Sequence, residues 1–201
     1  LVLYNLETSG AVLTSDNAVD IYTDGREKFE ALRQALRGAR RFIHIQYYII
    51  KNDEVFDSIV PILIEKVKEG VEVRILYDGM GGRFMPKRRW EEMRLAGIRV
   101  GTFFPPFLGW LNLRVNYRNH RKIVVIDGRT AFTGGVNLAD EYINAKVRFG
   151  HWKDTAVMIK GDAVTSFTMM FLQMWNVTEK EQDDYRAILR EPLPVEGGEG
   201  Y

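Results

Sequence analysis

Residues 119–137 read NHRKIVVIDGRTAFTGGVN, and this stretch decides what fold and chemistry the 201-residue chain can have. Its Ile123–Ile126 segment is apolar and rich in β-branched residues, which favours a buried strand. The Asp127-Gly128 pair is a strong signal for a tight turn, and Thr130–Thr133 then predicts the returning strand. We therefore expect a β-hairpin inside the core of a sheet.

The polar side chains of this stretch are predicted to meet at one end of the sheet. Because side chains alternate along a strand, His120 and Lys122 would point the same way. The returning strand ends at Gly134, Gly135 and Asn137, close to the same end. We expect these five residues to form a catalytic and phosphate-binding site, in which the glycine pair supplies flexible backbone.

These residue types favour chemistry at phosphorus. A histidine such as His120 can attack phosphorus and form a covalent intermediate. Lys122 and Asn137 can then offset charge on the non-bridging oxygens without a metal. Asp127 is expected to share this volume and to hold a histidine in the right tautomer, as carboxylates do in catalytic triads. The leaving alkoxide also needs a general acid, most naturally a second histidine, and the stretch does not contain one.

A known motif, H-x-K-x4-D-x6-G-(G/S)-x-N, is met at every specified place, by His120, Lys122, Asp127, Gly134, Gly135 and Asn137. The chain therefore resembles the phospholipase D superfamily. Segments such as HIQYYIIKND, GVEVRILYDGMG and HWKDTAV make it most similar to the first catalytic repeat of bacterial cardiolipin synthases, over about Val19 to Trp175. One departure is Ala156, where that family often has a histidine.

The resemblance implies that this chain holds half of an active site. In such enzymes two motifs meet across a pseudo-twofold axis; one histidine becomes phosphohistidine and the other serves as acid and then base. Only one motif is present here, because neither His44 nor His151 is followed by lysine two residues on. The other half would come from a second repeat of the same protein or from an identical chain. Which histidine attacks stays open.

The resemblance further implies a phosphatidyltransferase that forms cardiolipin and glycerol from two phosphatidylglycerols, with no metal or other cofactor. Phospholipid and a membrane surface are then the expected partners. Two alternatives stay open: a homodimeric phospholipase D-like phosphodiesterase or nuclease, and a catalytically silent, membrane-associated interaction module. The formal net charge of +1 makes nucleic acid an unlikely partner, since a general nucleic-acid binder is usually strongly basic.

Alternating strand and helix patterns predict an α/β fold, and the resemblance adds that it is a phospholipase D-like layered sandwich, a mixed β-sheet flanked by helices on both faces. Expected strands beyond the hairpin are Val19–Tyr22, Phe42–Ile50, Val71–Tyr77, Ile98–Phe103 and Trp152–Lys160. Expected helices are Asp24–Gly38, Glu54–Glu69, Pro86–Ala96, Asp162–Trp175 and, from a Thr178/Glu181 capping box, Thr178–Arg190. Pro61 should kink the second helix or delay its start.

Residues 1–177 are expected to form one phospholipase D-like domain, and residues 178–201 a C-terminal helix and linker toward a missing second repeat. The chain has no cysteine and no apolar stretch of the roughly 20 residues that span a bilayer. Because it begins with Leu1, we expect a piece of a longer, cell membrane-associated protein. The aromatic segment around Pro105-Pro106 is either packed on the domain or exposed for a partner.

Other polar residues are assigned more modest roles. His44 lies in an apolar strand, which favours a core histidine. Gln46 and Tyr47, at the end of that strand, are candidates for lining the site. His151 and Asp154 are expected to support the site rather than take part in the chemistry.

Overall fold

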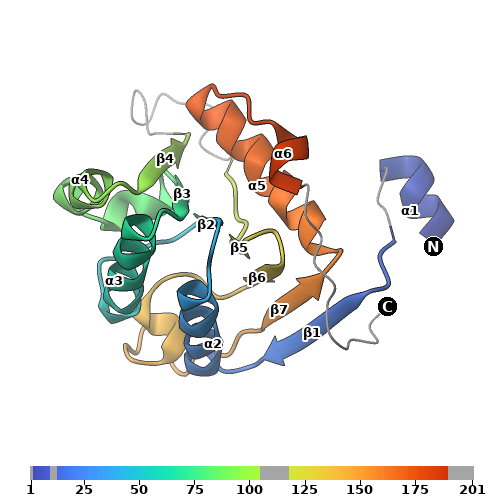
Figure 1. The fold of residues 1–201 in the computed structure, drawn as a ribbon. Coiled ribbons are helices and arrows are strands. Elements are labelled where there is room, and N and C mark those ends of the chain that lie inside the picture. Colours follow the sequence, from blue (N-terminus) through green and yellow to red (C-terminus); the bar gives the residue numbers. More distant parts are fainter. Residues whose placement is uncertain (1, 10–12, 105–117, 190–201) are drawn as a thin grey trace, which may run out of the picture.

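The computed structural model describes residues 2–9, 13–104 and 118–189, which form one seven-stranded sheet with helices on both faces (Figure 1). The strands are β1 (Asn17–Tyr22), β2 (Phe42–Tyr47), β3 (Glu72–Asp78), β4 (Arg99–Phe103), β5 (Ile123–Ile126), β6 (Thr130–Gly134) and β7 (Ala156–Gly161). Their order in the sheet is β1-β7-β6-β5-β2-β3-β4. The predicted α/β sandwich with a mixed sheet is confirmed. The aromatic segment and the end of the chain lie mostly outside the described residues.

The sheet changes direction between β2 and β5. Strands β2, β3 and β4 are parallel, and helices α3 (Glu54–Lys68) and α4 (Lys87–Leu95) make the crossovers that parallel strands require. Strand β5 runs antiparallel to β2, and β6, β7 and β1 continue antiparallel from there. The predicted hairpin is β5–β6, with its turn at Asp127-Gly128.

Two apolar layers hold the sheet between its helices. On one face α2 (Gly25–Arg37), α3 and α4 cover the largest core cluster, which includes the fully buried Phe29 and Phe56. On the other face lie α5 (Val164–Glu179) and α6 (Tyr185–Leu189), with Phe171 and Trp175 of α5 completely buried (Figure 1). None of the helices in the described residues is both long enough and apolar enough to cross a bilayer.

Several predicted boundaries differ from the structure. A short helix, α1 (Val2–Ser9), stands where an irregular segment was expected. Helix α3 begins at Glu54 and continues through Pro61, so the proline does not delay its start. Strand β2 ends at Tyr47 instead of Ile50, because the backbone of residues 49–51 pairs with Leu138 instead.

The predicted capping box at Thr178 and Glu181 is wrong. Helix α5 runs through Thr178 and ends at Glu179, where the C-cap residue Lys180 adopts a left-handed conformation with φ of 57°. The Glu181 carboxylate does not cap a helix, because it accepts a hydrogen bond from Trp175 Nε1 at 3.0 Å and pairs with Arg99. The last described helix is therefore the short α6.

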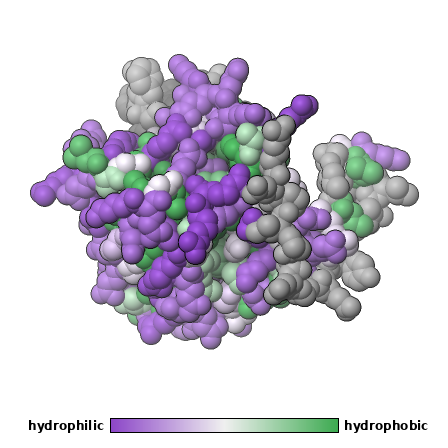
Figure 2. Space-filling view, in the orientation of Figure 1, coloured by the Kyte–Doolittle hydropathy of each residue, from purple (hydrophilic) through white to green (hydrophobic). Residues whose placement is uncertain are grey.

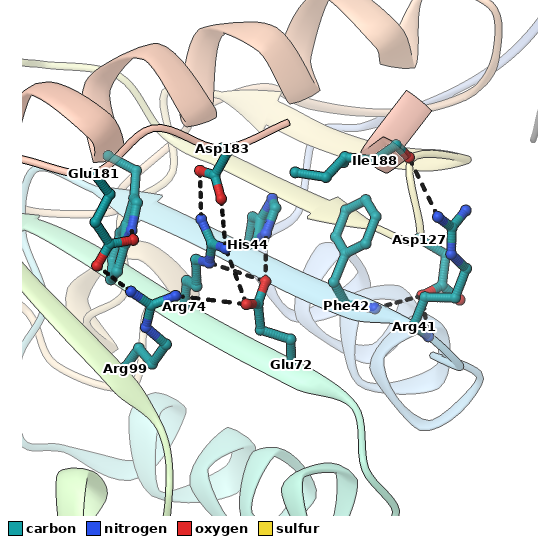
Figure 3. A network of polar contacts seen from close by, with 11 residues as sticks. Arg41, Phe42, His44, Glu72, Arg74, Arg99, Asp127, Glu181, Asp183 and Ile188 are labelled. Carbon is teal, nitrogen blue, oxygen red and sulfur yellow. Dashed lines mark hydrogen bonds and ion pairs between the residues drawn. The ribbon is translucent and has the colours of Figure 1, made fainter. Parts of the chain in front are cut away.

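A buried polar network ties the segment after α5 to the sheet (Figure 3). The Arg74 guanidinium donates to both oxygens of Asp183, at 2.7 and 2.9 Å, and pairs with Glu72 at 2.9 Å. His44 Nε2 lies 3.5 Å from Glu72 Oε1. The imidazole is stacked between the rings of Phe42 and of Phe171 in α5. Burial lowers the pKa of His44, so it is a neutral core histidine, as predicted.

The division of the chain into a domain of residues 1–177 and a C-terminal segment of residues 178–201 stays a prediction.

Candidate active site

One edge of the sheet brings together the motif residues other than Asp127, because of how the strands run. The parallel strands β2 and β3 end there, at Tyr47 and Asp78. Strand β5 is antiparallel to β2, so it begins at this edge, and β6 returns to it at Gly134. Strand β7 then begins there at Ala156. We call this the site edge.

His120 and Lys122 contact each other at the site edge. Lys122 Nζ lies 2.8 Å from His120 Nδ1 and 3.1 Å from Nε2, and it donates to the His120 carbonyl oxygen at 2.7 Å. Both residues precede β5 instead of lying within it, which begins at Ile123. The Tyr48 ring packs on the imidazole with centroids 4.7 Å apart. Lys122 is buried, whereas His120 is exposed at the surface.

The environment favours an unprotonated imidazole. Partial burial lowers the pKa of His120, the Lys122 cation lowers it further, and the Asp78 carboxylate opposes them. Burial also lowers the pKa of Lys122 to about 8, against the effect of Asp154. Near neutral pH the site therefore pairs a neutral histidine with a largely cationic lysine. An ammonium can donate only to a ring nitrogen that carries a lone pair, which agrees with this assignment.

Asn137 is buried and holds the loops of the site edge together. Its Oδ1 accepts a hydrogen bond from the Ile49 backbone N–H at 3.1 Å, and its Nδ2 donates to the Tyr142 hydroxyl at 2.7 Å. The amide thus joins the loop after β2 to η3 (Asp140–Ile143). Its predicted contact with a phosphate stays a prediction.

The glycine pair allows a carboxylate to approach the site. A Cβ atom on Gly135 would lie 2.0 Å from Asp154 Oδ1, and one on Gly134 would lie 2.4 Å from the Thr155 carbonyl oxygen. Gly134 also has a φ of 139°, which other residues rarely adopt. The observed role of the pair is close packing against residues 154–156. Binding of phosphate by these glycines stays a prediction.

Asp127 does not share this volume, and the expectation that it does is wrong. Its carboxylate accepts three backbone N–H bonds, from Arg40 at 2.8 Å, Arg41 at 2.7 Å and Phe42 at 2.9 Å. Figure 3 shows Asp127 beside Arg41 and Phe42. The whole of β5, a rise of roughly 13 Å, lies between Asp127 and His120 along the chain. Asp127 instead fixes the start of β2 against the turn that follows β5, at the opposite edge of the sheet.

The carboxylates that act on the site are Asp78 and Asp154. The first ends β3 and accepts from the Asn119 backbone N–H at 3.4 Å. The second, Asp154, accepts a hydrogen bond from Trp152 Nε1 at 3.3 Å, and its charge raises the pKa of Lys122. Asp78 could have been found from the rule that ligands gather at the carboxyl ends of parallel strands. Asp154 was expected to support the site, and its charge, which raises the pKa of Lys122, agrees with that expectation.

Gln46 and Tyr47, the candidates for lining the site, are both buried. The Tyr47 hydroxyl accepts a hydrogen bond from Lys28 Nζ at 2.7 Å, inside the core. The neighbouring Tyr48 is the residue that reaches the site edge, and sequence reasoning missed it. No group of three or more His, Asp or Glu side chains among the described residues is arranged to hold a metal ion.

Comparison with known proteins decides the family. Residues 32–175 match the family model described as "Cardiolipin synthase, PLD-like domain". The chain belongs to this family. It is 46% identical over 176 residues to the major cardiolipin synthase of Bacillus subtilis, and 43% identical over 194 residues to the cardiolipin synthase of Oceanobacillus iheyensis. These matches cover 88% and 94% of the chain but 36% and 40% of the relatives, so it spans little more than a third of their length.

Solved structures support the phospholipase D-like fold. The phospholipase D family member Nuc of Salmonella typhimurium matches with a TM-score of 0.58 at 19% identity, over 80% of this chain and 95% of Nuc. NucT of Helicobacter pylori gives a TM-score of 0.60 at 13% identity, over 81% and 98% of the two chains. Phosphatidylserine synthase of Haemophilus influenzae gives 0.58 at 14%, over 86% of this chain and 41% of that one. At such identities the likeness concerns the fold of this cardiolipin synthase-type domain.

Proposed function

We propose that the chain is one catalytic half of a phosphatidyltransferase, which forms cardiolipin and glycerol from two molecules of phosphatidylglycerol. The observation that carries this proposal is the exposed imidazole of His120 in contact with the buried Lys122 cation. The identity to proteins named cardiolipin synthase supports cardiolipin as the product. As a piece of such a protein, the chain would act at a cell membrane.

The first step forms a phosphohistidine. A ring nitrogen of His120 attacks the phosphorus of one phosphatidylglycerol, and the bond from phosphorus to the glycerol oxygen breaks. The Lys122 cation lies where it can offset negative charge on the non-bridging oxygens, and the buried Asn137 amide keeps the surrounding loops in place. A second histidine protonates the departing glycerol oxygen.

The second step reverses these roles. The same second histidine takes a proton from the hydroxyl of another phosphatidylglycerol, whose oxygen attacks the phosphohistidine. Cardiolipin leaves and His120 is restored. Water in place of the second lipid gives hydrolysis, so exclusion of water separates a transferase from a phospholipase. The proposed chemistry uses protein side chains alone.

The second histidine comes from outside this motif. His44 is buried between two phenyl rings and bonded to Glu72, so it is unsuited to exchange protons at the site edge. The curated relatives are more than twice as long as this chain, which favours a second repeat of the same protein as its source. An identical chain related by a twofold axis is the other source.

Covalent trapping tests the proposal. The protein that contains this chain together with its second motif, given radiolabelled phosphatidylglycerol and quenched rapidly, should form acid-labile phosphoprotein and release glycerol. His120→Asn should abolish the trapped intermediate and cardiolipin formation. Asp20→Asn, a change at an exposed residue of β1 outside the motif, is the control and should preserve both. Label that persists in His120→Asn would assign the attack to the other histidine.

The chain alone tests the half-site. A monomer of the 201 residues should convert little phosphatidylglycerol, because it holds a single motif. Robust turnover by a demonstrated monomer would contradict the proposal. Cleavage of DNA or of a soluble phosphodiester by a dimer would favour the alternative of a homodimeric phosphodiesterase or nuclease. Absence of chemistry even with the second motif present would favour a silent interaction module.

A further inference from the structure

A loop beside the site exposes two apolar side chains to solvent. We call residues 144–152 the rim loop; within it Val147 is 84% exposed and Phe149 is 76% exposed. Single exposed apolar residues are common on proteins, and Figure 2 shows hydrophobic residues only in small separate patches among hydrophilic ones on the face drawn. The contacts around the rim loop therefore decide whether the exposed Val147 and Phe149 form a binding surface.

The base of the rim loop is fastened to the catalytic motif. Asn144 and Trp152 close it with two hydrogen bonds, from Trp152 N to Asn144 Oδ1 at 2.6 Å and from Asn144 Nδ2 to Trp152 O at 3.0 Å. The Trp152 ring packs on Tyr142 at 4.7 Å, and Tyr142 accepts the hydrogen bond from Asn137. The two apolar side chains are thus presented from a fixed base instead of folding onto the core.

Cations surround these apolar side chains and face outward. Lys146 pairs with Asp140 at 3.3 Å, and Glu141 pairs with both Arg148 at 3.3 Å and Lys51 at 2.5 Å. The two carboxylate side chains are 1% and 4% exposed, whereas Lys146 and Arg148 are 65% and 47% exposed. The buried acids thus hold the cations in place, and of these ion pairs the cations are the more exposed members, although the exposed Glu54 also lies near enough to act on Lys146.

The same pattern continues onto η1 (Gly81–Phe84). The Lys51 ammonium lies 5.4 Å from the Phe84 ring, which is 43% exposed, and Arg83 lies 4.8 Å from the same ring. On the other side the Arg148 guanidinium lies 4.9 Å from the ring of Phe149. One connected series of contacts therefore runs from Phe149 through Arg148, Glu141 and Lys51 to Phe84.

We propose that the rim loop and Phe84 dock the chain on an anionic bilayer, with Val147 and Phe149 inserted at the boundary of headgroups and acyl chains. Apolar side chains flanked by lysine and arginine match that boundary, since the cations remain beside anionic headgroups while the apolar groups leave water. The proposal rests on the proposed function, because a lipid substrate must reach His120 at this same edge. Docking here would bring the exposed imidazole close to phospholipid headgroups.

Site-specific fluorescence tests the insertion, and the absence of native cysteine makes the labelling clean. Phe149→Cys carries an environment-sensitive dye, and Leu95→Cys is the matched control. Leu95 is 89% exposed but ends α4, just before β4 begins at the opposite edge of the sheet. Vesicles of phosphatidylglycerol should shift the emission of the dye at position 149 to shorter wavelength and leave position 95 unchanged.

Cosedimentation with the same vesicles measures the binding energy. The double variant Val147→Ser/Phe149→Ser should partition at least roughly tenfold less than the parent chain, because two apolar side chains no longer leave water. Lys146→Ala and Arg148→Ala should each weaken binding by roughly fivefold, and only with anionic lipid. Leu95→Ser should bind like the parent. All five changed positions are exposed, so circular dichroism should show an unchanged fold.

Several outcomes would overturn the proposal. These are absence of binding to anionic vesicles, binding without a dye shift at position 149, and equal weakening by Leu95→Ser. A dye shift that grows with protein concentration in the absence of lipid would assign the rim loop to an interface with a second copy. The His120→Asn variant separates this proposal from the proposed function. If His120→Asn binds vesicles like the parent but the covalent trapping experiment detects no phosphoprotein in the parent, the docking proposal is supported and the proposed phosphatidyl transfer is refuted.

Discussion

Asp127→Ala is expected to destabilise the fold by about 4 kcal/mol without disturbing the site edge. The carboxylate accepts three backbone N–H bonds of 2.7–2.9 Å. Bonds to a charged acceptor contribute up to about 1.5–3 kcal/mol each when buried; at this half-exposed position we take a net contribution of about 1 kcal/mol each, or about 3 kcal/mol for the three. Asp127 also has a φ of 56°, which alanine tolerates less well by about 1 kcal/mol.

Asp127→Asn should cost less, about 2 kcal/mol, because its remaining oxygen can keep the bonds to Arg41 and Phe42 while the amide faces the Arg40 N–H. Urea unfolding followed by the fluorescence of the four tryptophans measures both changes. Asp20→Ala, at an exposed site on β1, is the control and should lie within about 0.5 kcal/mol of the parent.

The site itself is monitored through the pKa of His120, by NMR titration of the three histidines. Removal of the Asp127 carboxylate should leave that pKa in place, because the residue lies at the other end of β5. If Asp127→Asn lowers the pKa of His120 while stability is unchanged, the carboxylate faces the imidazole and the structural reasoning is refuted.

Three further variants probe the site and the core. Lys122→Met should raise the pKa of His120 in the same titration, because the lysine cation lowers it; an unchanged pKa would contradict the observed contact. Burial lowers the pKa of Lys28 to about 7 in the folded chain, against about 10.4 in the unfolded chain. Between these two pH values the unfolded chain binds more protons than the folded chain, so the free energy of unfolding should rise with pH. Lys28→Met should remove that rise in urea unfolding measured from pH 7 upward, and an identical slope would refute the assignment. Gly135→Ala should displace the Asp154 carboxylate and cost about 1–3 kcal/mol of stability by the same unfolding assay.

Local patterns were sufficient for the elements that carry the fold. The β-branched run Ile123–Ile126 with its Asp-Gly turn predicted the β5–β6 hairpin, and the structure shows it. Alternating strands and helices predicted the layered sheet. The pairing of His120 with Lys122 follows from their two-residue spacing, although neither lies in the strand. These successes depend on interactions between residues close in sequence.

The failures depend on distant contacts. Asp127 bonds to backbone groups 85–87 residues earlier in the chain, and no local pattern reports such a partner. Asp154 was expected to support the site, but its close packing against Gly135 was not foreseen. The Asp-Gly turn signal and the motif spacing explain equally well why an aspartate stands at 127, so the sequence could not separate a structural from a catalytic carboxylate.

The pairing of β1 with β7 has a consequence for how the chain folds. Among the described strands, β1 lies at an edge of the sheet and pairs only with β7. Residues 17–22 therefore have no strand partner until residues 156–161 are in place. A loop of this length must close before the pair contributes any stability, and such long-range pairings slow folding. During synthesis on a ribosome, β1 therefore emerges long before its partner and stays unpaired, with Val19 and Ile21 available to chaperones or to other nascent chains.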